Sequence, residues 1–309
     1  MPEKRFDILV VGELNADIIL NGDVTPSFGQ VEKLVSDASL VLGSSSAIFA
    51  CGAARLGLKV AFVSKVGQDT LGEYCIQVLK NHQIDTSGVV VDPGVKTGMS
   101  IILNRGVDRA ILTYPGSMKE FTYLDINPVL IEHTRHLHMG GYYLLSSLQP
   151  QAVQLFGIAR GKGVTTSLDT NYDPSDRWDI DLEPLLRVTD VFLPNETEVL
   201  KISREASVEA GLQKLSQQAG IVVVKQGAQG AIAQKGVHVH RAAGLSIQVV
   251  DTVGAGDTFD VGFLYGFLHH WEITKSLHMG CVCGSLSTRQ AGGTAAQPTV
   301  NEALEFLQS

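Results

Sequence analysis

The stretch Asp251-Thr252-Val253-Gly254-Ala255-Gly256-Asp257-Thr258-Phe259 decides how the C-terminal third of the chain folds. It follows an apolar run at 245–250 and precedes another at 261–268, which predicts a strand, a tight glycine turn and a helix. A helix start leaves backbone N–H groups without partners and carries the positive end of the helix dipole, so it suits an anion. Gly254 and Gly256 would let a phosphate approach the backbone closely.

Asp257 falls in the first turn of this predicted helix, where a phosphoryl group would bind. A carboxylate there would repel a phosphate, so its presence needs a chemical reason. Accepting a proton from an attacking hydroxyl is such a reason. A simple N-cap is the alternative on local residues. A dinucleotide fingerprint would need a small residue in place of Phe259, and a Walker A loop needs a Gly-Lys-Ser/Thr triplet that the sequence lacks.

Five further short motifs occur in order along the chain: Gly12–Asp17, Gly43–Ala47 with Ala53–Gly57, Gly67–Gly72, Asn195–Glu198 and Lys225–Gly230. Together with the C-terminal stretch, they resemble the signature segments of the ribokinase family, the PfkB carbohydrate kinases. The resemblance covers nearly the full length, and six ordered matches are far more specific than any one of them.

Short, nearly continuous apolar runs alternate with helical patterns through most of the sequence. Such runs are typical of strands buried on both faces of a parallel sheet, and the alternation predicts a three-layer α/β/α fold with a mostly parallel central sheet. The expected strands are 6–11, 60–66, 136–139, 164–169, 191–193 and 221–225. The expected helices are 45–56, 71–81, 150–162, 196–202, 208–219, 256–269, 275–288 and 301–308.

Two regions break this alternation. Residues 16–42 contain turn-forming pairs between alternating polar and apolar residues, and 98–114 predicts two strands joined by 104–108. We expect a small projecting β-sheet with strands within about 13–42 and 97–115, inside one kinase domain spanning 1–309. In the family that the chain resembles, this sheet is a lid over the sugar and often a dimer surface.

Composition narrows the class of protein. The 309 residues are 44% hydrophobic and 18% charged, as in a globular enzyme. The net charge of −8 does not favour binding to nucleic acid or to an anionic membrane. The cysteines at 51, 75, 281 and 283 lie in apolar segments, which indicates reduced thiols in a cytoplasmic protein. The N-terminus leaves no room for a signal peptide before the first strand.

The resemblance implies specific roles on the nucleotide side, with ATP as phosphoryl donor and Mg²⁺ held through its phosphates and waters. Asp257 would be the base, and the N–H groups of Gly254, Ala255 and Gly256 the anion hole. Asn195 and Glu198 would lie near the magnesium, although they also form a helix capping box on local residues. The remaining nucleotide-side residues would be Lys225, Gly227, Gly230, Gly280 and Cys283, although the segment 227–230 alone favours a hairpin turn.

The resemblance also implies a monovalent cation site for K⁺. Its ligands would be Asp251 and carbonyl groups of Val253, Leu286, Arg289 and Gly293. The tail at 289–294 is longer than in ribokinase itself, which leaves the choice among these carbonyls open.

On the sugar side the resemblance implies Asn15, Asp17, Gly43, Ser44 and Ala47. Asn15 and Asp17 occupy alternate positions of a strand and share a face, so they could hydrogen-bond to adjacent sugar hydroxyls. The alternative is that both residues only form a turn at the end of the strand.

Three departures bear on the substrate. Ile48 replaces an asparagine ligand of ribokinase, and Gly141-Tyr142 stands where ribokinase has a sugar-binding acid. Asp173 replaces the arginine of a D-x-N-x-R segment found in fructokinases and ketodeoxygluconate kinases, which argues against sugar acids.

These features predict an ATP-dependent carbohydrate kinase that phosphorylates a hydroxymethyl group of a small sugar. The resemblance implies a homodimer that forms through the lid. The alternatives are a nucleoside kinase of the adenosine type and a sugar-binding protein without catalysis. The cluster of His133, His136 and His138 is expected to be solvated or core histidines rather than a metal site.

Overall fold

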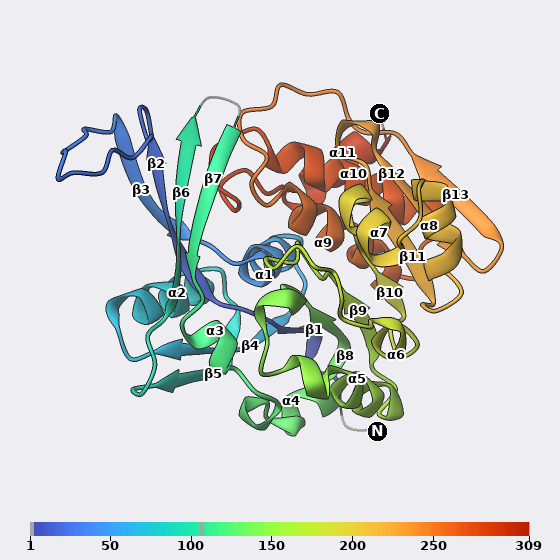
Figure 1. Ribbon diagram of the computed structural model, residues 1–309. Helices are drawn as coiled ribbons and strands as arrows, with labels where there is room; N and C mark the ends of the chain where they lie inside the picture. The colour runs from blue at the N-terminus through green and yellow to red at the C-terminus, as the bar shows by residue number, and fades with distance from the viewer. Residues whose placement is uncertain (1–2, 106–107, 309) are drawn as a thin grey trace.

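The computed structural model describes residues 3–105 and 108–308, and its largest element is a nine-stranded sheet (Figure 1). The strands of this sheet are β1 (Phe6–Val11), β4 (Val60–Gly67), β5 (Asp85–Asp92), β8 (Thr134–Met139), β9 (Thr165–Leu168), β10 (Val191–Phe192), β11 (Ile221–Lys225), β12 (Ala231–Lys235) and β13 (His238–Ala242). Their order is β13-β12-β11-β10-β9-β8-β1-β4-β5. All neighbours are parallel except β12, which is antiparallel to both β11 and β13.

Helices cover both faces of this sheet because successive strand residues point to opposite sides. Ile8 and Val10 pack in one hydrophobic cluster, whereas Leu9 and Val11 pack in the other. The first cluster includes α1 (Ser45–Arg55), α2 (Thr70–Asn81), α9 (Ala255–Leu268), α10 (Ile273–Ser287) and α11 (Val300–Gln308). The second includes α4 (Pro128–Glu132), α5 (Ala152–Gly161), α6 (Glu183–Leu186), α7 (Glu196–Ser203) and α8 (Val208–Leu215). The three-layer α/β/α prediction is confirmed.

Short elements complete the main body. They are α3 (Ser117–Glu120) and the 3₁₀ turns η1 (Tyr123–Asp125), η2 (Tyr142–Leu144), η3 (Gln149–Gln151) and η4 (Gly227–Gln229).

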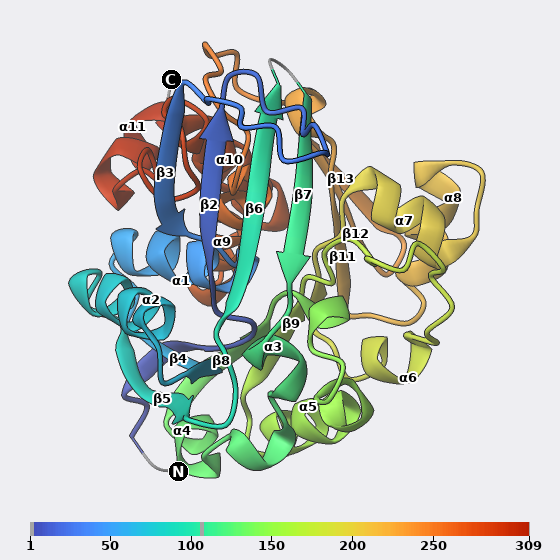
Figure 2. The same ribbon diagram turned by 60° about the vertical axis from the view of Figure 1, so that its left-hand side comes forward.

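A separate four-stranded sheet stands away from the main sheet, as both ribbon views show (Figures 1 and 2). Its strands are β2 (Asn15–Asn21), β3 (Asp37–Leu42), β6 (Gly98–Arg105) and β7 (Asp108–Tyr114), in the order β3-β2-β6-β7. We call it the lid sheet. The predicted small sheet is therefore present; the turn expected between β6 and β7 includes residues 106 and 107, which lie outside the described residues.

The strand predicted at Leu245–Val250 is wrong. This segment is irregular after β13, and Leu245 and Ile247 pack against the core while Val249 and Val250 are exposed. Its apolar residues serve as a wall of a pocket rather than as a strand, as described below. Three strands were missed, namely β5, β12 and β13, of which β5 and β13 form the two edges of the main sheet.

Two of the clustered histidines and all four cysteines lie in the protein interior. His136 and His138 are buried, and a ring nitrogen of each lies within 2.8 Å of Ser167 Oγ. No group of three or more His, Cys, Asp or Glu that could hold a metal ion occurs in the described part of the chain. The four cysteines are free and buried. No helix in residues 3–105 or 108–308 is long and apolar enough to cross a membrane.

Candidate active site

The glycine turn of the C-terminal signature begins α9, as the sequence predicted. Gly254 is the N-cap residue with φ 72°, and a Cβ there would lie 2.8 Å from Gly293 Cα. The left-handed conformation and this close contact both require glycine. A Cβ on Gly256 would meet nothing nearer than Lys225 Nζ at 3.7 Å, so the space beside Gly256 is open. Ala255 donates its N–H to the Thr252 carbonyl at 3.3 Å, so it could serve an anion only if that weak bond opened.

Asp257 lies in the first turn of α9 and is almost fully buried. Burial, followed by the nearby negative charge of Asp169, raises the pKa of Asp257 to about 7, although a hydrogen bond from Ser45 opposes the shift. A carboxyl with a pKa near neutral pH exchanges protons efficiently under cellular conditions. Asp257 therefore has the environment of a general base.

A lysine that is largely shielded from solvent lies beside the same turn. Lys225 Nζ is 2.7 Å from Asp169 Oδ2 and 3.0 Å from Asp260 Oδ2. Burial disfavours a charged lysine, but the charge of Asp169 and then that of Asp260 raise the pKa of Lys225 above its usual value. Conversely, burial raises the pKa of Asp260 well above its usual value, more than Lys225 lowers it. Although burial opposes the change, the charge of Lys225 and hydrogen bonds lower the pKa of Asp169, so the pKa values of the two acids beside the ammonium are shifted in opposite directions.

Lys225 and Gly256 both line a pocket of about 480 Å³. Apolar and backbone groups line most of it, as expected for a site that holds a nucleobase. Its lining residues come from the loop after β11, the irregular segment after β13, α9 and α10: Lys225, Gly227, Ala228, Gly230, Gly244, Leu245, Ser246, Ile247, Val249, Thr252, Ala255, Gly256, Phe259, Cys281, Gly284, Ser285 and Thr288.

Five of the predicted nucleotide-side and turn residues, Lys225, Gly227, Gly230, Ala255 and Gly256, thus meet in this pocket. Gly280 and Cys283 do not line it. Gly280 packs against the Phe259 ring, which a Cβ would approach to 2.8 Å, and Cys283 is fully buried. One helical step away, Cys281 and Gly284 line the pocket instead, because only that stripe of α10 faces it.

Asn195 and Glu198 form the helix capping box that local residues favoured. Glu198 N–H donates to Asn195 Oδ1, while Glu198 accepts from the backbone and side-chain nitrogens of Asn195 at 2.9 and 2.7 Å. Burial, then the charge of Asp169, raises the pKa of Glu198 to about 7. Asn195 pairs with Lys225 in an isolated parallel bridge, so the box lies next to the lysine cluster.

The segments predicted to hold a monovalent cation do come together. Asp251 accepts hydrogen bonds from Val253 N at 3.0 Å and Gly292 N at 2.9 Å, and thereby joins the glycine turn to the tail. The Leu286 carbonyl accepts from the side chain of Arg289 at 2.8 Å, which occupies one of the expected ligands. Gly293 packs directly against Gly254.

On the sugar side, Asn15 and Asp17 are neighbours on one face of β2, and Asn15 Nδ2 donates to Asp17 Oδ1 at 2.8 Å. Burial raises the pKa of Asp17 to about 6 despite this bond. Gly43 leaves room for Asp17, since a Cβ there would lie 2.2 Å from Asp17 Oδ1. Ser44 caps α1 by accepting from Ala47 N at 3.0 Å, so Ala47 contributes its backbone rather than its buried side chain.

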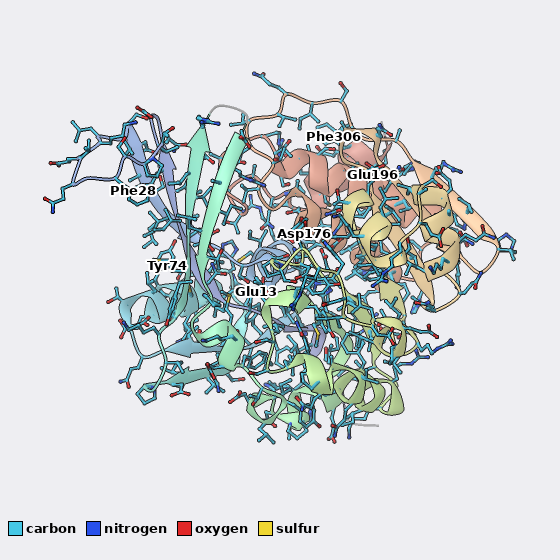
Figure 3. The ribbon with its side chains drawn as sticks, viewed as in Figure 1. Glu13, Phe28, Tyr74, Asp176, Glu196 and Phe306 are labelled. Carbon is cyan, nitrogen blue, oxygen red and sulfur yellow. The ribbon has the colours of Figure 1, made fainter. Side chains whose placement is uncertain are left out.

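Glu13 is a buried acid that the sequence analysis did not single out, and it lies where β1 leads into the lid sheet (Figure 3). It accepts hydrogen bonds from Ser46 N at 3.1 Å and Ser46 Oγ at 2.6 Å. A Cβ on Gly141 would lie 2.0 Å from Glu13 Oε2. Glu13 therefore fills space beside the position where the ribokinase acid is missing from this chain. Its position within the Gly12–Asp17 motif was the sequence feature that could have identified it as a site residue.

Asp173 does not point a free charge at a ligand. Its carboxylate accepts from Ser175 N, Ser175 Oγ and Trp178 N, each at 2.8 Å, and is nearly buried. Asp173 therefore stabilises its own loop, and the repulsion argument drawn from the sequence loses its main support.

The three-layer α/β/α fold thus brings together an apolar pocket, a glycine turn and a buried carboxyl group, the arrangement expected of a phosphotransferase. The family model described as "pfkB family carbohydrate kinase" matches residues 5–300. The chain therefore belongs to the pfkB family of carbohydrate kinases and is a sugar kinase by family, as the sequence predicted.

Similar proteins agree with this assignment. A 5-dehydro-2-deoxygluconokinase of Geobacillus thermodenitrificans is 30% identical over 99% of this chain and 94% of the relative. A putative ribokinase II from E. coli, solved in complex with ATP and Mg²⁺, superimposes with a TM-score of 0.87 at 23% identity and covers 98% of this chain and 99% of that chain. Arabidopsis thaliana ribokinase complexed with ribose and ATP has a TM-score of 0.85 at 21% identity and covers 98% and 99%.

Proposed function

We propose that the protein is an ATP-dependent kinase that transfers the γ-phosphoryl group to a hydroxymethyl group of a small neutral sugar or polyol, with Asp257 as base. The observation that carries the proposal is the position of Asp257. It lies one residue after the open Gly256, beside the nucleotide pocket, and on its other side contacts Ser45 of the sugar-side helix α1.

In the proposed reaction, Asp257 accepts the proton of the substrate hydroxyl as that oxygen attacks the γ-phosphorus. The N–H groups of Gly254 and Gly256 and the ammonium of Lys225 would stabilise negative charge on the transferring group. A magnesium ion bound to ATP would neutralise phosphate charge. Asn195 and Glu198 adjoin the lysine cluster, and the Glu198 carboxylate already accepts hydrogen bonds from Asn195. These two residues would therefore contact the magnesium ion through its bound waters.

The substrate proposal rests on the acids of the sugar side. Asp17 and Glu13 are buried and Asn15 is paired with Asp17, a set that favours hydroxyl donors over a substrate carboxylate. The relative named 5-dehydro-2-deoxygluconokinase makes its sugar acid a necessary comparison. A nucleoside kinase and a binding protein without catalysis remain the alternatives to be tested.

A coupled ADP-release assay over D-ribose, D-fructose, D-glucose, adenosine and 5-dehydro-2-deoxygluconate tests this proposal. We expect turnover with a neutral sugar that exceeds turnover with the sugar acid. Faster turnover with adenosine would identify a nucleoside kinase, faster turnover with the sugar acid would contradict the neutral-substrate proposal, and none with any sugar or nucleoside would favour a binding protein.

We propose potassium as an activating ion. Support comes from Asp251, which joins the glycine turn to the tail near Gly292. In the same assay, the Asp251→Ala variant should lose most of any activation seen when KCl replaces NaCl. An unchanged potassium response in this variant would exclude the site.

We also propose that residues 1–309 act as a single cytoplasmic kinase domain, without nucleic-acid or membrane partners, that pairs with a second copy through the lid sheet. Leu40, Ile111 and Leu112 of this sheet are exposed apolar residues, and Phe28 projects from the β2–β3 connection (Figure 3). Sedimentation should show a dimer that Ile111→Lys weakens. A monomer at every concentration would contradict this arrangement.

A further inference from the structure

Asp257 is held by a chain of hydrogen bonds that begins on a different part of the fold. Ser45, the first residue of α1, donates from Oγ to Asp257 Oδ1. Asn171, in the loop after β9, donates from Nδ2 to Ser45 Oγ at 2.9 Å. None of the sequence motifs assigned a role to Ser45 or Asn171.

The donor and acceptor of each hydrogen bond in this series follow from the bond that Gly141 makes with Asn171. Gly141 N donates to Asn171 Oδ1 at 2.9 Å, so the amide nitrogen of Asn171 must be the group that faces Ser45. Since that nitrogen is a donor, Ser45 Oγ accepts from it and its single proton is directed to Asp257. The hydroxyl of Ser45 thus reaches Asp257 as a donor, which favours the ionised carboxylate.

The backbone of Asn171 is also fixed. Its φ is 55°, in the left-handed region that asparagine tolerates better than most residues. Its N–H donates to Asp169 Oδ1 at 3.0 Å, while the other oxygen of Asp169 binds Lys225. The chain therefore runs from the lysine of the nucleotide pocket through Asp169, Asn171 and Ser45 to the proposed base.

We propose that Ser45 and Asn171 are positioning residues that hold Asp257 Oδ1 and direct Oδ2 to the substrate hydroxyl. This inference rests on the proposed function, because it assumes that Asp257 is the base. The arrangement has two consequences. One oxygen of the carboxylate is oriented before substrate binds, and the ionised form is stabilised in a buried place that otherwise disfavours it.

The pH dependence of turnover separates this role from a structural one. With D-fructose as the probe substrate, kcat of the unchanged enzyme should rise through pH 7 as Asp257 ionises. In Ser45→Ala the rise should move up by about one pH unit, because a hydrogen bond to a charged group is lost. Turnover should therefore fall roughly fivefold at pH 7 and recover by about pH 9, with KM for ATP unchanged.

Matched variants sharpen the test. Ser45→Thr keeps the hydroxyl and should restore the original profile, and Ser216→Ala, at the end of α8, should leave it unchanged. Asn171→Gly keeps the left-handed backbone without strain but removes the amide, so it should shift the profile in the same direction as Ser45→Ala and by less. Thermal unfolding of each variant verifies that the fold persists.

A measurement without turnover keeps the proposal testable if D-fructose is a poor substrate. Carboxyl ¹³C NMR can follow the Asp257 resonance, which Asp257→Asn assigns by removing it. The titration midpoint should be higher in Ser45→Ala than in the unchanged protein. An unmoved midpoint, or a loss of kcat equal at every pH, would overturn the positioning role while leaving Asp257 as base. Activity retained in Asp257→Asn would instead refute the assignment of Asp257 as the base, on which this inference rests.

Discussion

Gly256 and Gly43 belong to the two sides of the proposed site, and an added Cβ would meet very different surroundings at each. Beside Gly256 the nearest atom would be Lys225 Nζ at 3.7 Å, whereas beside Gly43 the Asp17 carboxylate would lie at 2.2 Å. The nucleotide side therefore uses glycine to leave room for a ligand. The sugar side uses it to let one of the protein's own acids approach the backbone.

The two sides also differ in charge. The nucleotide side presents a turn of backbone N–H groups and the ammonium of Lys225, while the sugar side presents Glu13 and Asp17. Phosphate is an anion of fixed shape, so a backbone turn recognises it, but a sugar is recognised by several side chains at particular distances. The comparison suggests where each substitution should act.

The largest effect is expected from Asp257→Asn, which removes the proposed base at the junction of the two sides. We expect kcat to fall about 10²–10⁴-fold while KM for ATP and sugar changes little. Because burial raises the pKa of Asp257 to about 7, ionisation of this group lowers stability as pH rises from about 4 through 7. Asp257→Asn should therefore unfold at higher urea concentration than the unchanged protein at pH 8, and at a similar concentration at pH 4.

The next effect concerns stability. Lys225→Met would leave Asp169 without its ammonium partner in a buried place, at a cost of about 3–5 kcal/mol in the free energy of unfolding. Urea denaturation measures this cost. Asp260→Asn is the matched control: the raised pKa of Asp260 favours its neutral acid, which this change replaces with a neutral amide of similar shape, so it should cost far less. Equal losses in the two variants would show that Asp260, and not Asp169, carries the negative charge.

The glycine pair tests the comparison directly. Gly256→Ala should leave stability near normal but raise KM for ATP roughly tenfold, because the new methyl group occupies the open space beside the turn. Gly43→Ala should instead displace Asp17 and raise KM for the sugar. Steady-state kinetics with each substrate varied in turn separates the two outcomes. A sugar-side defect in Gly256→Ala would show that the two sides are not divided as proposed.

The smallest effect is expected from Asp17→Asn. The pKa of Asp17 is about 6, so between pH 5 and 7 this group becomes a carboxylate, which accepts hydroxyl hydrogen bonds more strongly than the neutral acid. KM for the sugar should fall by roughly tenfold over that range in the unchanged enzyme. In Asp17→Asn, KM should be high and nearly independent of pH, as kinetics at a series of pH values would reveal.

The periodicity of apolar residues and the order of the short motifs along the sequence were enough to predict much of this fold. The bounds of β1 and β11 agree with the predicted runs, and the glycine turn begins a helix as expected. The run at Leu245–Val250 misled because a pocket wall and a buried strand have the same apolar composition. Likewise, Cys281 lines the pocket where Cys283 was expected, because only packing decides which side of α10 faces the pocket.

The sequence by itself determined the family, the layered fold and the place of the glycine turn, because each is encoded in short segments whose residues act on their own backbone. Only the tertiary structure decided what surrounds the proposed base. Ser45 and Asp257 are 212 residues apart, and Asn171 and Ser45 are 126 apart. No local pattern announces such contacts, since they exist only once the sheet has brought α1, α9 and the loop after β9 together.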